Sequence, residues 1–197
     1  TDAILAPFVR AQATIDTLAS ATRALESALK QRGFGLYKVV LPPQELGATV
    51  RLEIVRFTLE KVEVRGNQFA DQDNILASLP ELSPGHSPNL ERLSRQTGIA
   101  NNSAYKQVRV GLKESAVADR IDATIVVQDV NPLMFGADLS NAGTKSTGYD
   151  RIILLAGHGN LFNRDHSLSA AWTTSATRPE DVNQWGLAYR IPLYSLG

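Results

Sequence analysis

The chain has 197 residues, enough for one or two domains, and its 20 basic and 20 acidic residues give a formal net charge of zero. The balanced charge leaves no electrostatic footprint for nucleic acid, and the absence of cysteine excludes a disulfide framework and a cysteine-based zinc site. A hydrophobic fraction of 43% is typical of an ordered globular protein. No apolar run is long enough to predict a transmembrane helix, and we expect no signal peptide within these residues.

The first part of the chain predicts one helix followed by two strands. Apolar residues at steps of three and four predict a helix over Thr14–Arg32, capped by Thr14 and ended by Gly33. Strands are predicted over Leu36–Leu41 and Thr49–Phe57. An opening strand is either missing from this part or drawn from Ile4–Arg10.

The next part, up to Pro132, predicts a strand, two short helices and two further strands. Asp71 or Asp73 is placed to cap the first helix, and Ser87-Pro88 to open the second. Residues 107–112 and 121–127 alternate with period two, which indicates strands with one buried face. The order helix, strand, strand therefore occurs twice, and this indicates two copies of one fold in tandem.

After Pro132 the pattern changes to segments of eight to ten residues joined by turns. Residues 133–140, 167–174 and 184–191 alternate, with an apolar and aromatic face and a small, polar face; residues 149–157 form a less regular strand. This pattern is typical of an outer-membrane barrel strand, but a soluble sandwich strand gives the same alternation. Four strands are too few to close a barrel, which needs about eight, so the membrane alternative implies that these strands are a fragment.

Few residues suggest catalysis. His158 and His166 flank a turn and would have to meet across a hairpin to bind a metal, while His86 has no partner at helical spacing. Gly157-His158-Gly159 lacks the lysine and helix start of a phosphate loop, and no serine lies in a nucleophile elbow. We therefore expect no catalytic residue, no metal and no cofactor, and a protein that is not an enzyme.

Several short stretches follow one another in an order that resembles a known family. They are Gly33-Phe34, Leu41-Pro42-Pro43-Gln44-Glu45-Leu46, Val62–Phe69, Leu79–Gly85 with Pro88-Asn89, Asp129–Pro132, Leu139–Gly148, Asn160–Phe162 and Tyr189–Leu193. Together they are similar to the outer-membrane transporters of two-partner secretion, the hemolysin secretion and activation type within the Omp85 superfamily.

The resemblance implies an α+β chain with a defined layout. It consists of two tandem POTRA domains, each β-α-α-β-β, over residues 1–57 and 58–131, followed by the first four antiparallel strands of a truncated transmembrane β-barrel over 132–197. The first domain either lacks its opening strand at the N-terminus or draws it from Ile4–Arg10. In this family the POTRA domains lie in the periplasm and capture the N-terminal secretion domain of an unfolded exoprotein, which then crosses the outer membrane through the barrel. Because most of the barrel falls outside these residues, only recognition is expected of them.

Edge strands are the expected recognition surface, because an extended exoprotein segment can add to them by main-chain hydrogen bonds. Lys38 and Arg109 would point off the core face, and a groove between edge and helix would be mostly apolar. The expected client-binding residues are Leu36, Tyr37, Lys38, Val39, Val40, Leu41, Lys106, Val108, Arg109 and Val110. The expected partners are the exoprotein and, through the barrel, outer-membrane lipid, with no small-molecule substrate. The alternatives are that these edges are merely solvated, and that the protein is a soluble periplasmic POTRA-type adaptor or outer-membrane protein assembly factor with a C-terminal β-domain.

Overall fold

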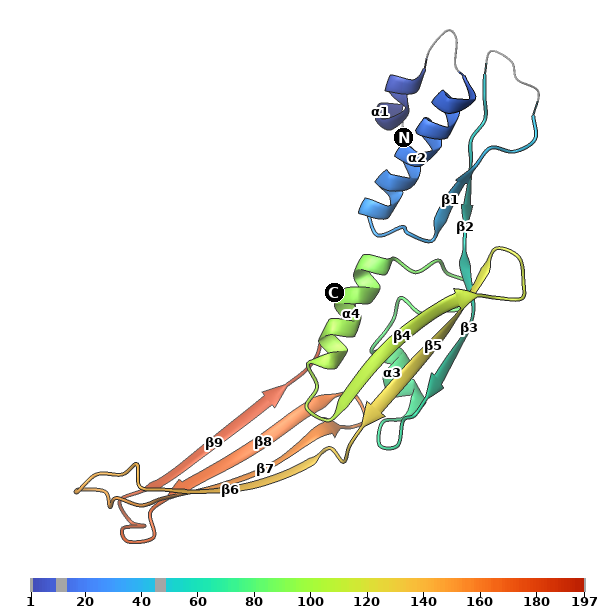
Figure 1. Ribbon diagram of the computed structural model, residues 1–197. Coiled ribbons are helices and arrows are strands. Elements are labelled where there is room, and N and C mark those ends of the chain that lie inside the picture. The colour runs from blue at the N-terminus through green and yellow to red at the C-terminus, as the bar shows by residue number, and fades with distance from the viewer. Residues whose placement is uncertain (1, 10–13, 45–48, 197) are drawn as a thin grey trace. The chain divides into compact units, whose positions relative to one another are not determined.

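The computed structural model (Figure 1) describes residues 2–9, 14–44 and 49–196. Its residues divide into two compact units. Unit 1 comprises Thr1–Glu63, Leu79–Gln96 and Val110–Ile125, and unit 2 comprises Val64–Ser78, Thr97–Arg109 and Val126–Gly197. The domain limits expected after residues 57 and 131 remain a prediction. Among the described residues, no helix combines the length and the apolar character that crossing a membrane would require.

Unit 1 begins with helical structure. Helix α1 (Asp2–Leu5) runs into the 3₁₀ turn η1 (Ala6–Phe8), so the alternative of an opening strand from Ile4 is wrong for the described residues. Pro7 lies in the first turn of η1, a position where its fixed φ and its missing N–H are tolerated. Arg10, the far end of that expected strand, lies outside the described residues.

Helix α2 (Ile15–Gln31) confirms the predicted first helix and its caps. The side chain of Thr14 accepts a hydrogen bond from the Thr17 N–H (3.3 Å), and Gly33 follows the helix in the left-handed region, with φ of +84°. Leu25 is buried, as the apolar stripe predicts. Ile15, expected on the same stripe, is 77% exposed, because it lies in the first turn of the helix.

Strands β1 (Tyr37–Val40) and β2 (Glu53–Arg56) form a two-stranded antiparallel sheet with Tyr37 opposite Arg56. Both strands are shorter than the sequence predicts. The side chain of Gln44 donates to the Arg51 carbonyl (2.8 Å) and accepts from its N–H (2.8 Å), which takes Arg51 out of strand pairing. Glu45 and Leu46, part of the family-like stretch, lie outside the described residues.

Three further strands form a second sheet in the order β3-β5-β4 (Figure 1), with the long strand β5 in the centre. The elements are β3 (Thr58–Arg65), α3 (Gln72–Ala77), α4 (Leu90–Asn101), β4 (Lys106–Glu114) and β5 (Arg120–Asp129). The order α2-β1-β2 is thus followed by α4-β4-β5, as the sequence predicts. In unit 1 the buried apolar side chains include Leu59, Leu79, Leu93 and Ile125, and in unit 2 Ile75, Val108 and Val127.

The start of α4 differs from the prediction. The helix begins at Leu90 instead of at Ser87-Pro88, because the Asn89 side-chain oxygen accepts from the N–H groups of Glu91 (3.0 Å) and Arg92 (3.1 Å). The same asparagine donates to the Arg32 carbonyl (3.0 Å), and so it joins the start of α4 to the end of α2.

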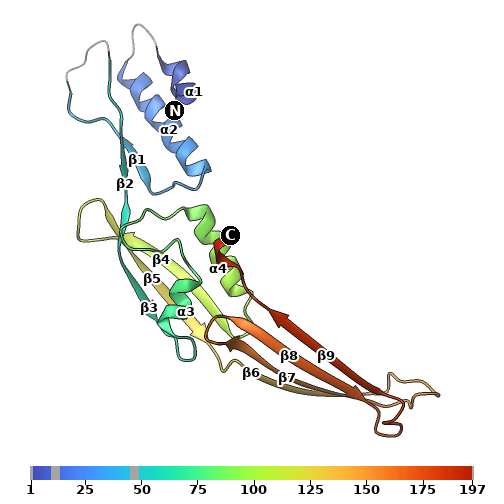
Figure 2. The same cartoon turned by 180° about the vertical axis from the view of Figure 1, so that it is seen from behind.

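Unit 2 contains the third sheet, an antiparallel meander in the order β6-β7-β8-β9 (Figure 2). The strands are β6 (Leu133–Ser140), β7 (Arg151–Leu161), β8 (His166–Thr174) and β9 (Asn183–Arg190), and η2 (Tyr194–Leu196) follows them. The four predicted segments are therefore strands, each displaced by a few residues at most.

Asp150 joins the two loops at one end of this meander. Its carboxylate accepts hydrogen bonds from the Ser175 hydroxyl (3.1 Å), the Ala176 N–H and the Thr177 hydroxyl. The bond from Thr177 lowers the pKa of Asp150 most, desolvation opposes it, and the bonds from Ala176 and Ser175 lower the pKa further, to about 2. The loop between β6 and β7 is therefore fastened to the loop between β8 and β9.

Asp129, in the family-like stretch Asp129–Pro132, has a defined structural role. Its carboxylate accepts hydrogen bonds from three successive backbone N–H groups, those of Gln68 (2.9 Å), Phe69 (2.8 Å) and Ala70 (2.8 Å). An acceptor that satisfies three N–H groups at once fixes the backbone between β3 and α3.

Candidate functional site

The first expected client-binding segment, Leu36–Leu41, contains strand β1. The Phe57 N–H donates to the Leu36 carbonyl (2.9 Å), so Leu36 faces β2, and by alternation Tyr37 and Val39 turn their main-chain groups to the opposite side. On that side the Val39 N–H donates to the Glu26 carboxylate (3.0 Å) and the Tyr37 N–H to the Phe34 carbonyl (3.3 Å). The donors on the free side of β1 are therefore already used within the chain.

The second segment contains strand β4, which lies at the edge of its sheet as predicted. The side-chain amide of Asn101 donates to the Val108 carbonyl (3.0 Å) and accepts from the Val108 N–H (2.7 Å). Val108 therefore directs its main-chain groups away from β5, and so do Val110 and Leu112, which have the same parity. Among the described residues, nothing occupies the outward groups of Val110 and Leu112.

The side chains of the expected residues differ in accessibility. Lys38 and Arg109 are exposed, as expected, and the Lys38 ammonium lies 5.1 Å from the centre of the Phe57 ring. Val39 and Val108 are buried, and only their main chains face the edge. Lys106 is also buried, and so its side chain is not a surface contact.

Unit 1 contains a hollow of about 210 Å³ beside these strands. Its apolar walls are Leu36, Phe57, Leu112 and Ile121, and the charged residues that line it are Lys38, Lys113 and Glu114. An apolar groove was expected between an edge strand and a helix, but none of the lining residues belongs to a helix. The hollow brings together the start of β1 and the end of β4.

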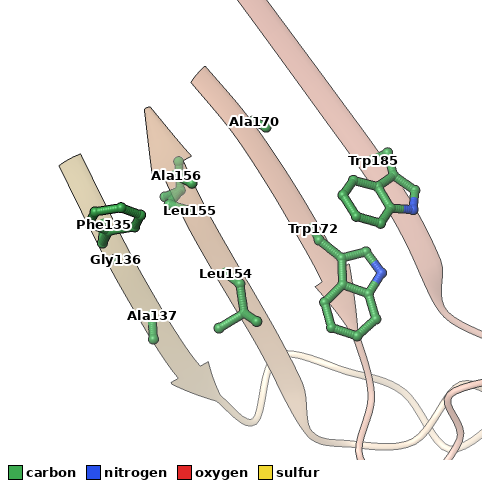
Figure 3. Close-up of a pocket in the computed structure, with 9 residues that line it drawn as sticks. All are labelled: Phe135, Gly136, Ala137, Leu154, Leu155, Ala156, Ala170, Trp172 and Trp185. Carbon is green, nitrogen blue, oxygen red and sulfur yellow. The ribbon is translucent and has the colours of Figure 1, made fainter. Parts of the chain in front are cut away.

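The four-stranded sheet has one apolar face. In antiparallel pairs, directly opposed residues point to the same side, and the register places Phe135 opposite Ala156, Leu154 opposite Trp172 and Trp172 opposite Trp185. The residues that share this face are Leu133, Phe135, Ala137, Leu139, Ile152, Leu154, Ala156, His158, Leu168, Ala170, Trp172, Thr174, Asn183, Trp185, Leu187 and Tyr189. Figure 3 shows part of it, with Trp172 and Trp185 beside each other on neighbouring strands. Their rings stack with centroids 5.9 Å apart.

Large side chains on this face are open to the surroundings. Phe135 is 80% exposed, Leu187 78% and Leu139 76%. The opposite face has mostly small and polar residues, for example Gly136, Asp138, Ser169 and Gln184. A contiguous exposed apolar surface of this kind marks a contact with lipid or with another protein.

A buried polar cluster in unit 2 surrounds Asp165, in the turn between β7 and β8. The Lys106 ammonium lies 2.7 Å from an Asp165 oxygen and 2.7 Å from the Asn74 side-chain oxygen. The hydroxyls of Tyr105 and Tyr194 both donate to the same carboxylate. The turn has positive φ at Phe162, Asn163 and Asp165, a conformation that is uncommon for residues other than glycine.

Burial and charge oppose each other in this cluster. Burial raises the pKa of Asp165, but the charge of Lys106 and the hydrogen bonds outweigh it, so the pKa lies below its ordinary value. Burial lowers the pKa of Lys106, and Asp165 offsets this only in part. Burial, followed by the hydrogen bond to Asp165, raises the pKa of Tyr105 and of Tyr194. The cluster is a fully paired ionic link between β4 and the β7–β8 turn.

The histidines do not form a site. His158 lies opposite Leu168, and His166 lies opposite Leu161, so the hairpin does not bring the two histidines together. The His166 ring is hydrogen-bonded to the Tyr189 hydroxyl (2.6 Å) instead. In the described ranges, no group of three or more potential ligands is placed to hold a metal ion.

Three residues that determine these surfaces were not predicted from the sequence. Asn101 bonds to the main chain of Val108 at the β4 edge, and Glu26 accepts from the Val39 N–H on the free side of β1. Asp165 joins the β7–β8 turn to Lys106. Asn101 is seven residues from the Val108 that it contacts, and the partners of Glu26 and Asp165 are 13 and 59 residues away along the chain. Only the position of Asp165 between two strands was a signal, since a turn readily accepts an aspartate.

Comparison with known proteins identifies the fold. No protein-family model matches the sequence, and no curated protein matches it. Among solved structures, CdiB from Escherichia coli superposes with a TM-score of 0.83 at 17% identity, over 97% of this chain and 36% of that chain. CdiB from Acinetobacter baumannii gives a TM-score of 0.71 at 15% identity, over 98% and 38%. The chain has the fold of the matching part of CdiB.

POTRA domains are also similar to part of the chain. POTRA domains 1–3 of the periplasmic domain of Omp85 from Anabaena superpose with a TM-score of 0.51 at 18% identity, over 66% of this chain and 58% of that chain. The resemblance to Omp85-type outer-membrane transporters is thereby confirmed for the fold, which is α+β with POTRA-like neighbours and antiparallel strands in the first and third sheets. The chain spans little more than a third of the length of the two CdiB chains.

Proposed function

We propose that this chain is the recognition region of an outer-membrane protein transporter of two-partner secretion. Two tandem POTRA domains lie in the periplasm and capture an unfolded exoprotein through its N-terminal secretion domain. Strands β6–β9 are the first strands of a β-barrel in the outer membrane, through which the exoprotein then passes. The fold shared with CdiB supports this assignment.

The observation that carries the proposal is the two-faced sheet β6–β9. Its register gathers the apolar side chains on one face and leaves them exposed, whereas a soluble sandwich would cover such a face with a second layer. This favours the barrel over the adaptor with a soluble C-terminal β-domain. The unpaired sides of β6 and β9 are then the positions at which further barrel strands add.

The partner assignment is tested by calorimetry. The chain in detergent micelles is titrated with the N-terminal domain of the large secreted protein encoded beside its gene, and we expect saturable binding. An unrelated secreted domain of similar size serves as the control. Equal heats for both domains, or none for either, would overturn the recognition role.

The membrane assignment has its own test. The two tryptophans of the chain, Trp172 and Trp185, both lie on the apolar face, so their fluorescence reports on its surroundings. On reconstitution into phospholipid vesicles we expect a blue shift and quenching by bromine atoms placed on the lipid acyl chains. Emission typical of water, without such quenching, would show that this face does not meet lipid.

A further inference from the structure

The recognition edge is open over only part of its length. In β1 the outward donors are taken up by Glu26 and Phe34, and in β4 the Asn101 amide saturates both main-chain groups of Val108. An asparagine that donates to and accepts from the same residue occupies the place of a pairing strand. Beyond Val108, the outward N–H and C=O groups of Val110, Leu112 and Glu114 have no partner among the residues that the structure describes.

Only an extended peptide matches a row of alternating donors and acceptors, since each outward residue needs one acceptor and one donor from its partner. Val110, Leu112 and Glu114 have the required parity. A short peptide strand can therefore pair with these three residues, beginning at Val110. Val110 is the next outward-facing residue after Val108, whose main-chain groups are already bonded to Asn101.

The hollow lies at the end of this stretch, because Leu112, Lys113 and Glu114 line it. Its volume of about 210 Å³ suits one medium-sized apolar side chain, and Leu36, Phe57 and Ile121 complete the apolar wall. Lys38 and Lys113 outnumber Glu114 among its charged residues, so the hollow carries a positive balance. None of these three has an ion-pair partner in the part of the chain that the structure describes.

We propose that an extended exoprotein segment pairs with Val110–Glu114 alone, inserts one apolar side chain into the hollow, and places an acidic side chain beside Lys113. This inference rests on the proposed recognition function. It adds a starting register, a binding pocket and a sequence preference: an apolar residue with an acidic neighbour.

The pairing is tested first on the unaltered chain. Hydrogen exchange of the chain in micelles is measured with and without the N-terminal domain of the neighbouring secreted protein. We expect the amides of Val110 and Leu112 to become protected. Binding that protects neither amide would overturn the inference and leave the recognition function intact, whereas an absence of binding would overturn both.

A proline variant then tests the edge. Val110→Pro removes an outward N–H that the sheet does not use, and we expect binding about tenfold weaker with unchanged circular dichroism. The matched control is Lys61→Pro on β3. The main-chain groups of Leu59 bond to Gly85 and His86, on the side of β3 that faces away from β5. Lys61, two residues further along, points its N–H to the same side, at the edge of the sheet opposite β4. Equal affinities of the two variants would contradict the proposal.

A charge variant tests the hollow. Lys113→Glu is expected to weaken binding about fivefold and to reduce its dependence on salt. Lys145→Glu, in the exposed loop between β6 and β7, makes the same change in net charge and is expected to leave binding unchanged. The protected exoprotein segment should contain an apolar residue next to an aspartate or glutamate, and a segment without that pair would exclude the sequence preference.

Discussion

Replacing Asp165 by asparagine should destabilise the chain strongly, because the buried Lys106 would lose its counter-ion, and both an unpaired ammonium and its deprotonation cost free energy. The pair is 2.7 Å apart, and the side chains are 0% and 3% exposed. At an effective dielectric constant of about 20, their Coulomb attraction is about 6 kcal/mol, most of which offsets the cost of taking two charges out of water. Removing one partner of such a pair lowers the free energy of unfolding by about 3–5 kcal/mol. For a chain of this size, a loss of about 3 kcal/mol lowers Tm by about 6–12 °C.

Thermal unfolding of the chain in micelles, followed by circular dichroism, measures this effect. Asp181→Asn is the matched control, since Asp181 and Arg178 form an ion pair at 3.6 Å that is 43–50% exposed and should contribute less than about 1 kcal/mol. Adding Lys106→Met to Asp165→Asn should recover part of the loss, because no unpaired charge remains. A Tm for Asp165→Asn within about 2 °C of the control would refute the reasoning.

Further predictions concern a glycine, a carboxylate and pH. Gly33→Ala should cost about 1–3 kcal/mol in unfolding free energy, because φ is +84° and the new Cβ would lie 2.2 Å from the Asn89 side-chain oxygen; an unchanged Tm would contradict this. Asp129→Ala should speed the hydrogen exchange of the backbone amides of Gln68, Phe69 and Ala70, which donate to this carboxylate. Exchange as slow as in the unaltered chain would show that the carboxylate does not hold these amides. The stability that Asp165 provides is present above its unfolded pKa of about 3.9 and is lost as the pH falls through its lower folded pKa. The raised pKa of Tyr105 gives stability below about pH 10 that is lost as the pH rises further, so Tyr105→Phe should flatten the alkaline limb of Tm against pH.

Local patterns predicted most of the secondary structure. The α2 helix was predicted to within one residue at each end, because Thr14 and Gly33 are the residues that cap it. The start of α4 was misplaced because two neighbouring signals compete, and the hydrogen bonds of Asn89 outweigh the preference of proline for a first turn. An opening strand over Ile4–Arg10 was one of two alternatives, and the helical structure of Asp2–Phe8 shows that it is wrong for the described residues.

The candidate site was predictable only in outline. Alternation identified β4 and the apolar face, since period two determines which side chains share a face. Which main-chain groups of β4 stay free depends on Asn101, seven residues from Val108, and on a side-chain orientation that no periodicity encodes. The buried partner of Lys106 is 59 residues away, so the sequence pattern could not show that this lysine turns inward.

The fastening of the two loops by Asp150 has a consequence for how the meander assembles. Two hairpins with independent loops can form and dissolve separately, whereas here the β6–β7 loop is held by groups that follow β8. The four strands should consequently order in a single cooperative step. An epitope inserted into either loop should disturb the neighbouring hairpin as well as its own, and acidification should not loosen the joint until the pH approaches 2.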